Sequence, residues 1–160
     1  MKTKIFIGCC VLLFPAFLFA QVIEHQKASN LPEGAIQFRK EEVIWKEAPS
    51  TLPAGSRVTV LEGNPKSEGM FTMRVELKPF AKINPHFHPR EERVTIISGD
   101  VYLGFGEQMD TMANYTHFSK GSFYINPPKS IHYVFTQKKS AVLQITGMGP
   151  WELIYPGEKK

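Results

Sequence analysis

The chain has 160 residues, of which 42% are hydrophobic, and a formal net charge of +4. This length and composition predict one globular domain with a sizeable hydrophobic core and exclude a second domain. The basic residues are dispersed among acidic ones and form no cluster, so a nucleic-acid partner is not expected.

The first 20 residues are predicted to be an export signal. Two lysines precede an apolar run over 5–19, which ends at the small residue Ala20. The run is short for a membrane span of about 20 apolar residues, and a polar stretch follows at once, so cleavage is favoured over retention as an anchor. We therefore expect an exported protein, periplasmic or secreted, that begins near Gln21 and has no stable membrane anchor.

Both cysteines, Cys9 and Cys10, lie inside this signal. The mature chain would then have no disulfides and no thiolate ligands, which suits an oxidising compartment. Any metal ion would be held by nitrogen and oxygen donors.

Residues 21–52 are polar and mixed, and we expect them to form an N-terminal arm with one or two edge strands. Over 53–156, short apolar or alternating runs recur between Gly, Pro, Asn and Asp, which is typical of an all-β sandwich or barrel. The clearest strand is 70–77, because apolar and polar residues alternate along it. Further strands are predicted over 94–97, 100–105, 122–125, 131–137 and 141–145. We expect a meander of hairpins that closes into one antiparallel barrel, lined by alternate residues of each strand.

The segment 84–92 contains residues spaced for metal chelation. His86 and His88 are two residues apart, so on a strand both imidazoles point to the same face, about 7 Å apart along the chain. The same parity brings Glu92 to that face and sends Glu91 to the other, unless a bend at Pro89 breaks it. Taken singly, such side chains are usually surface or satisfied core residues. Burying all three side chains on one interior face without a counter-ion would cost several kcal/mol for each, and a metal ion removes that cost.

A second segment, 121–132, is predicted to supply the fourth ligand. A strand runs into a Pro-Pro turn, and the next strand opens with His132, which a hairpin would bring back toward the first pair. His25, in the arm, and His117, on an expected loop, are interpreted as structural or solvent-exposed residues.

These two segments resemble the paired motifs of the cupin superfamily. The first motif is met by His86, His88, Glu92 and Gly99, and the second by Gly121, Pro127 and His132. Three motif positions differ, since Phe80 and Lys129 stand where glycines are expected and Thr136 where an asparagine is expected. The resemblance covers 70–145 and implies an antiparallel jelly-roll β-barrel of the RmlC-like or germin-like kind with an N-terminal arm. By the same resemblance, a homodimer is expected, with the arm as the contact.

The four candidate ligands suit one divalent transition-metal ion, namely Mn, Fe, Co, Ni or Zn, and leave two octahedral positions open. Zinc would more often be four-coordinate, which this set nearly fills. The expected lining is apolar and comes from Val94, Ile96, Val134 and either Phe71 or Met73. No catalytic acid or base is identified, although Tyr102 and Tyr124 are candidate hydrogen-bond donors whose commoner role is core packing.

Two hypotheses on function follow from this site, and fold alone does not choose between them. The first is a metal-dependent, dioxygenase-like enzyme or related oxidoreductase acting on a small chelating molecule. The second is a non-catalytic module that binds or senses a metal or a small ligand. Trp151, near the C-terminus, is expected to pack over one end of the barrel from a final strand.

Overall fold

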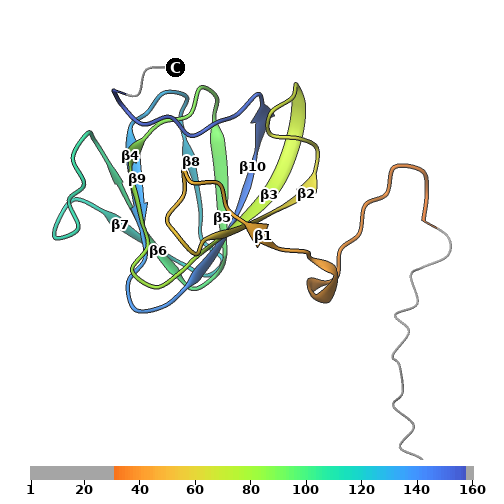
Figure 1. Ribbon diagram of the computed structural model, residues 1–160, viewed down its shortest axis with the longest axis horizontal. Coiled ribbons are helices and arrows are strands. Elements are labelled where there is room, and N and C mark those ends of the chain that lie inside the picture. Colours follow the sequence, from red (N-terminus) through yellow and green to blue (C-terminus); the bar gives the residue numbers. More distant parts are fainter. Residues whose placement is uncertain (1–30, 158–160) are drawn as a thin grey trace, which may run out of the picture. The chain divides into compact units, whose positions relative to one another are not determined.

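The computed structural model describes residues 31–157, so the predicted signal, its cleavage point and His25 lie outside the described residues. All described strands belong to one compact unit, Ile36–Lys160. Figure 1 shows these strands in two layers. In chain order they are β1 (Lys46–Glu47), β2 (Arg57–Glu62), β3 (Gly69–Leu77), β4 (Lys82–His86), β5 (Glu92–Ser98), β6 (Asp100–Phe105), β7 (Thr116–Ser119), β8 (Phe123–Asn126), β9 (His132–Phe135) and β10 (Ala141–Gly149), with a short 3-10 helix, η1 (Lys40–Glu42), before them.

The strands form two antiparallel sheets, which confirms the predicted all-β, jelly-roll architecture. The six-stranded sheet has the order β1-β2-β3-β10-β5-β8, and the four-stranded sheet has the order β4-β9-β6-β7. Among the described residues no strand pair joins one sheet to the other, so the hydrogen bonding does not continue around a single closed barrel. The core lies between the two layers.

The expected meander of hairpins is wrong, because most consecutive strands lie in different sheets. Chain neighbours pair only in β1–β2, β2–β3 and β6–β7. The turn at Gly99 carries the chain from the six-stranded to the four-stranded sheet, with a φ of 73° that favours glycine. A Cβ at Gly99 would lie 2.1 Å from the backbone oxygen of Ser140, so no larger residue fits. Turn residues therefore fixed where the chain reverses but not which strand it joins.

Alternating side chains of both sheets fill the interior. On β3, Phe71, Met73, Val75 and Leu77 are buried, as the alternation predicted. The expected lining residues Val94, Ile96 and Val134 are buried in the same cluster. Full burial of one such side chain is worth about 1.5–3 kcal/mol, so this layer supplies much of the drive to fold.

The turn before β4 depends on Thr136, the residue that replaces the asparagine of the cupin motif. The Thr136 hydroxyl donates to the backbone oxygen of Lys78 (2.6 Å) and accepts from the backbone N–H of Ala81 (3.0 Å). Between them Phe80 has a φ of 61°, an unusual value for a large side chain. A buried threonine thus closes the turn that leads into β4 and its terminal His86.

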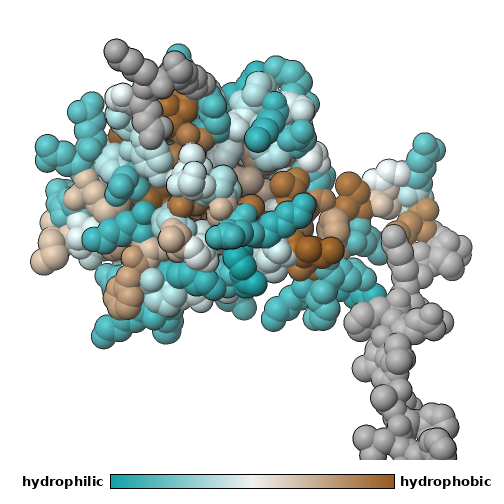
Figure 2. Space-filling model, in the orientation of Figure 1, coloured by the Kyte–Doolittle hydropathy of each residue, from teal (hydrophilic) through white to brown (hydrophobic). Residues whose placement is uncertain are grey.

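The segment before the core sheets exposes apolar side chains. Ile36, Phe38 and Ile44 are 59%, 50% and 75% exposed, and Figure 2 shows hydrophobic atoms along this part of the chain. Strand β1 lies within the predicted arm and pairs with β2 at the sheet edge. The arm boundary at residue 52 stays a prediction. Over residues 31–157, no helix has the length and apolar character needed to cross a bilayer.

Candidate metal centre

The four predicted ligands lie at strand ends in the interior. His86 ends β4, Glu92 begins β5 and His132 begins β9, while His88 follows β4 by two residues. His86 and His132 are cross-strand partners. Their exposures are 2%, 2%, 5% and 1% for His86, His88, Glu92 and His132. The parity argument placed Glu92 on the inner face, and the structure has it there.

The three histidines form a compact cluster with the carboxylate beside it. One nitrogen of each imidazole lies within 4.8 Å of the other two. The carboxylate oxygens of Glu92 lie 3.5 Å from His88 Nε2 and 3.6 Å from His132 Nε2. The structure therefore brings all four side chains together, and their role as metal ligands stays a prediction.

The opposite ring nitrogen of each histidine is held by a backbone carbonyl. The Nδ1–H groups of His86, His88 and His132 donate to the carbonyl oxygens of Asn84 (2.8 Å), Glu152 (2.8 Å) and Ser130 (2.9 Å). Because a carbonyl only accepts, each Nδ1 carries the proton and each neutral ring has its lone pair on Nε2. These three contacts orient the rings and fix their tautomers, the arrangement typical of metal-bound histidines.

The cluster consequently gathers acceptors with no donor between them. The Nε2 atoms of His88 and His132 are buried and have no hydrogen-bond partner. Glu92 Oε2 accepts one bond, from Asn126 Nδ2 at 2.8 Å. Unsatisfied buried acceptors cost free energy, and a cation placed among them removes that cost.

The surroundings lower the pKa values of His86, His88 and Glu92. Burial, together with the neighbouring histidines, lowers the pKa of His86 to about 3. Burial also lowers the pKa of His88. Burial opposes ionisation of Glu92, whereas His88 and His132 in their charged form, together with the Asn126 hydrogen bond, favour it and lower its pKa to about 2. At neutral pH His86 and His88 are therefore neutral and Glu92 is ionised, which is the state in which such groups bind metal.

The donor geometry fits a single transition-metal ion. Two ligands about 2.1 Å from one ion are at most about 4.2 Å apart, and both Glu92–histidine distances are shorter than this limit. Three ligand atoms held about 2.1 Å from one ion are at most about 3.6 Å apart when equally spaced, so histidine nitrogens at the 4.8 Å limit would each move inward by about 0.7 Å to bind it. Imidazole and carboxylate donors suit Mn, Fe, Co, Ni and Zn.

Only one of the two candidate tyrosines lies near the ligands. Tyr124 is buried against Phe118, and its burial, with the charge of Glu92 nearby, raises its pKa well above the usual value. Tyr102 lies on the opposite face of its sheet, stacked on Phe135 and His117. It is therefore excluded from the site.

Two further side chains considered from the sequence, His117 and Arg90, lie outside the cluster. His117 was expected on a loop, but it lies on β7 and pairs with Asp100 (Nε2 to Oδ1, 3.0 Å). Arg90, which shares the parity of the histidines, is exposed, and its guanidinium lies 3.4 Å from Glu68. Neither contributes charge to the cluster.

Sequence reasoning missed the role of the C-terminal segment. Residues 151–153 are not part of a strand, contrary to the expectation for Trp151. The indole of Trp151 stacks on His88 with ring centroids 4.3 Å apart, and Glu152 provides the carbonyl that holds the same histidine. Its aromatic character was a signal for packing, but a backbone carbonyl leaves no signal in a sequence.

The chain is similar to a known protein family and to several solved structures. The family model described as the ChrR cupin-like domain matches residues 33–152. No curated protein matches the chain. Among solved structures, the polyketide cyclase RemF from Streptomyces resistomycificus has a TM-score of 0.64 at 13% identity, covering 78% of this chain and 87% of that one.

Two other solved structures have similar folds at low identity. A cupin-2 domain protein from Rhodospirillum rubrum has a TM-score of 0.59 at 13% identity, covering 76% of this chain and 80% of that one. A sugar phosphate isomerase of the cupin superfamily from Silicibacter pomeroyi has a TM-score of 0.56 at 16% identity, covering 76% and 82%. At such identities the likeness concerns the fold alone.

Proposed function

The chain belongs to the ChrR cupin-like family of the cupin superfamily, and we propose that it binds one divalent transition-metal ion through His86, His88, Glu92 and His132. The observation that carries the proposal is the convergence of four buried acceptor groups, among which the Nε2 atoms of His88 and His132 have no donor. Three backbone carbonyls hold the Nδ1 protons outward, so the Nε2 lone pairs and the Glu92 carboxylate face one another. Burying these groups together without a counter-ion costs free energy, and a bound cation removes that cost.

We propose further that the site serves a metal-dependent oxygenase or related oxidoreductase, with dioxygen as co-substrate and a small chelating enol, diketone or carboxylate as substrate. A bound ion would supply two further coordination positions and a Lewis-acid or redox centre. The residues of this chain would orient the ligands through the three carbonyls, and the apolar lining would exclude water. Tyr124 is the nearby group able to donate a hydrogen bond to a substrate.

The structural relatives of this chain have different names, so they do not indicate its reaction. A polyketide cyclase and a sugar phosphate isomerase share the fold. One architecture thus accompanies several chemistries, and a shared fold does not select one.

Metal content and oxygen uptake test the proposal together. Purified protein from media supplied with Mn, Fe, Co, Ni or Zn should contain about one ion per chain by elemental analysis. His88→Ala should lose it, and His117→Ala, a histidine outside the cluster, should keep it. With iron, manganese or nickel bound, diketones or carboxylates should cause oxygen consumption. Absence of metal from the unmodified protein under every condition would refute the site.

A non-catalytic metal-binding or sensing module is the second candidate. It is favoured by the near-complete burial of all four ligands and by the absence of other charged side chains from the cluster among the described residues. Full zinc occupancy without oxygen consumption for any substrate in the panel would support this candidate over the oxygenase.

We also propose a homodimer that uses the segment before β1. The exposed Ile36, Phe38 and Ile44 offer an apolar contact, and β1 covers only the first residues of β2, leaving Val60 47% exposed at that edge. Light scattering should give twice the chain mass. A double change of Ile36→Ser and Ile44→Ser should give the monomer mass, whereas a monomeric unmodified protein would exclude this assembly.

Export after signal cleavage is proposed from the first 20 residues alone. N-terminal sequencing of the protein recovered from the periplasm or medium should start near Gln21. Recovery from the cytoplasm with an intact N-terminus would contradict it.

A further inference from the structure

His88 differs from the other two histidines in where its orientation comes from. The carbonyls that hold His86 and His132 each lie two residues earlier, in Asn84 and Ser130. The carbonyl that holds His88 belongs to Glu152, which is 64 residues away. Two of the imidazoles are thus oriented by their own strand ends, and the third depends on a remote segment.

That segment makes several contacts around the cluster. Ile154 and Phe87 exchange two main-chain hydrogen bonds of 3.0 Å, and Phe87 lies between the two clustered histidines of its segment. The Trp151 indole covers one face of His88. The backbone N–H of Trp151 donates to the backbone oxygen of Pro65 at 2.7 Å, and the Tyr155 ring lies 6.2 Å from the His86 ring.

We propose that residues 151–155 form a C-terminal latch, which fixes His88 for metal binding when closed and must shift for small molecules to reach the ligands. This inference rests on the proposed metal site and adds its regulation. The first half follows from the Glu152 carbonyl, since without it the His88 proton can move to Nε2 and remove the ligand lone pair. The second half follows from burial, since no candidate ligand is more than 5% exposed.

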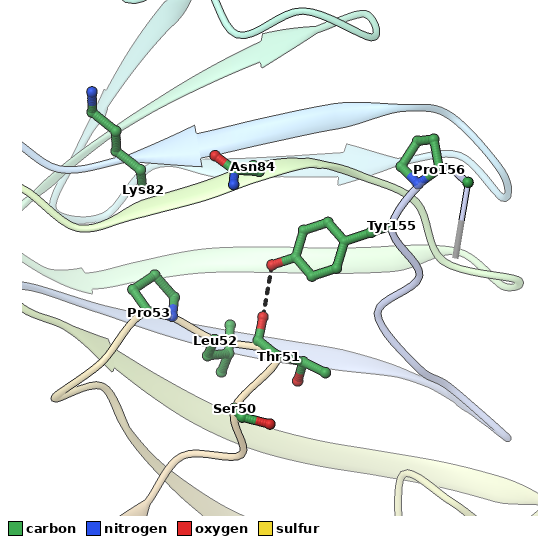
Figure 3. A pocket seen from close by; sticks show the side chains of 9 residues that line it. Ser50, Thr51, Leu52, Pro53, Lys82, Asn84, Tyr155 and Pro156 are labelled. Carbon is green, nitrogen blue, oxygen red and sulfur yellow. Dashed lines mark hydrogen bonds between the residues drawn. The ribbon is translucent and has the colours of Figure 1, made fainter. Parts of the chain in front are cut away.

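The outer end of the latch borders an open cleft of about 630 Å³, which none of the four candidate ligands lines. Figure 3 shows Tyr155 pointing across this cleft, where its hydroxyl donates to the backbone oxygen of Thr51 at 2.7 Å. Asn84 lines the same cleft, while its carbonyl holds His86 on the inner side. The latch therefore ends at solvent, where the bond from Tyr155 to Thr51 connects it to the loop before β2.

A pair of substitutions at one position isolates the latch from side-chain packing. Ile154→Pro removes the N–H that donates to Phe87, whereas Ile154→Ala removes the side chain but keeps both main-chain bonds. Loss of an orienting contact to a metal-bound histidine typically lowers metal affinity by about 10–100-fold. We expect Ile154→Pro to bind metal at least about 10-fold more weakly than Ile154→Ala and to release it faster to a chelator. Equal affinities and release rates in two folded variants would overturn the latch.

Two further measurements separate failure of the latch from failure of the metal site or of folding. In metal-free protein, nitrogen-15 spectra should give the Nδ1–H tautomer for His88 in the unmodified chain and mixed tautomers in Ile154→Pro. A fixed tautomer in both would refute the latch even if no metal binds. If Ile154→Pro does not fold, Tyr155→Phe replaces it, and we expect faster metal release because the bond to Thr51 is lost. An unchanged release rate would contradict the opening step.

Discussion

Replacing the central carboxylate with its neutral isostere should change metal binding and apoprotein stability in opposite directions. In Glu92→Gln the side-chain volume is kept, but one oxygen becomes an NH2 donor. The amide oxygen retains the position that accepts from Asn126, and the NH2 then faces His88 Nε2, which lies 3.5 Å from the carboxylate. A metal ligand is lost, and a buried acceptor gains a donor.

The magnitudes follow from those contacts. A donor for a buried, unsatisfied acceptor is worth about 1–3 kcal/mol, and the Asn126 bond weakens by about 1 kcal/mol when its acceptor becomes neutral. The metal-free variant should therefore be about 1 kcal/mol more stable, equivalent to a Tm about 3–5 °C higher for a unit of this size. Metal affinity should fall by more than about 100-fold, because a charged ligand is removed and not merely an orienting contact.

Thermal and urea unfolding of chelator-treated protein measure the first effect, and competition with a chromophoric chelator measures the second. Glu91→Gln is the matched control, since Glu91 is on the other face and pairs with Arg93 at 2.7 Å on the surface. That pair contributes about 0–1 kcal/mol, so both readouts should stay near the unmodified values. A metal-free Glu92→Gln that is less stable, together with unchanged metal affinity, would refute the acceptor-cluster argument.

Three other predictions concern pH and packing. The His86 pKa of about 3 lies below its value in the unfolded chain, so the unfolded chain binds more protons below about pH 6.5. This residue should therefore lower the free energy of unfolding of the metal-free protein by about 2 kcal/mol between neutral pH and pH 5. A free energy of unfolding that does not change with pH would contradict this. Thr136→Val should cost about 1–3 kcal/mol, measured by urea unfolding, because the bond to Lys78 and the acceptor for the following turn are lost. Gly104→Ala should cost at least about 1–3 kcal/mol, since its Cβ would lie 2.1 Å from the Tyr133 ring; a Tm equal to that of the unmodified chain would show that the ring moves freely.

The strands were predictable where one face is buried and the other is wet. The alternation over 70–77 lies within β3 as found, and the apolar runs around Val94 and Leu143 correspond to β5 and β10. Pairing was not predictable in the same way. Asn126 and the prolines after it mark a reversal in either architecture, but β8 pairs with β5 whereas β9 pairs with β4 and β6. Local turn chemistry fixes a change of direction, and the partner strand is set by the packing of distant residues.

The candidate ligands were recognisable from their spacing, but the reason given for choosing Glu92 over Glu91 does not hold. That choice treated 84–92 as one strand, whereas His86 ends β4 and Glu92 begins β5 in the other sheet. Glu92 is buried as an inward residue of β5 and not because it shares a strand with the histidines. Strand β7 was missed because only Phe118 of its four residues is even partly buried, which is too short a pattern to reveal a period of two. His117 was therefore assigned to a loop.

The orientation of the candidate ligands is only partly determined by residues close to them in the sequence. His86 and His132 each take their carbonyl from two residues earlier, so a short segment that folds correctly also fixes the tautomer. His88 follows the end of β4, where regular pairing stops, and its carbonyl comes from Glu152 after the last strand. A set of three pre-oriented imidazoles is thus completed only when the C-terminal segment has packed. Changes in that segment should therefore alter metal affinity, although it is distant in sequence from the ligands. His88 should be the first ligand to lose its orientation when the protein begins to unfold.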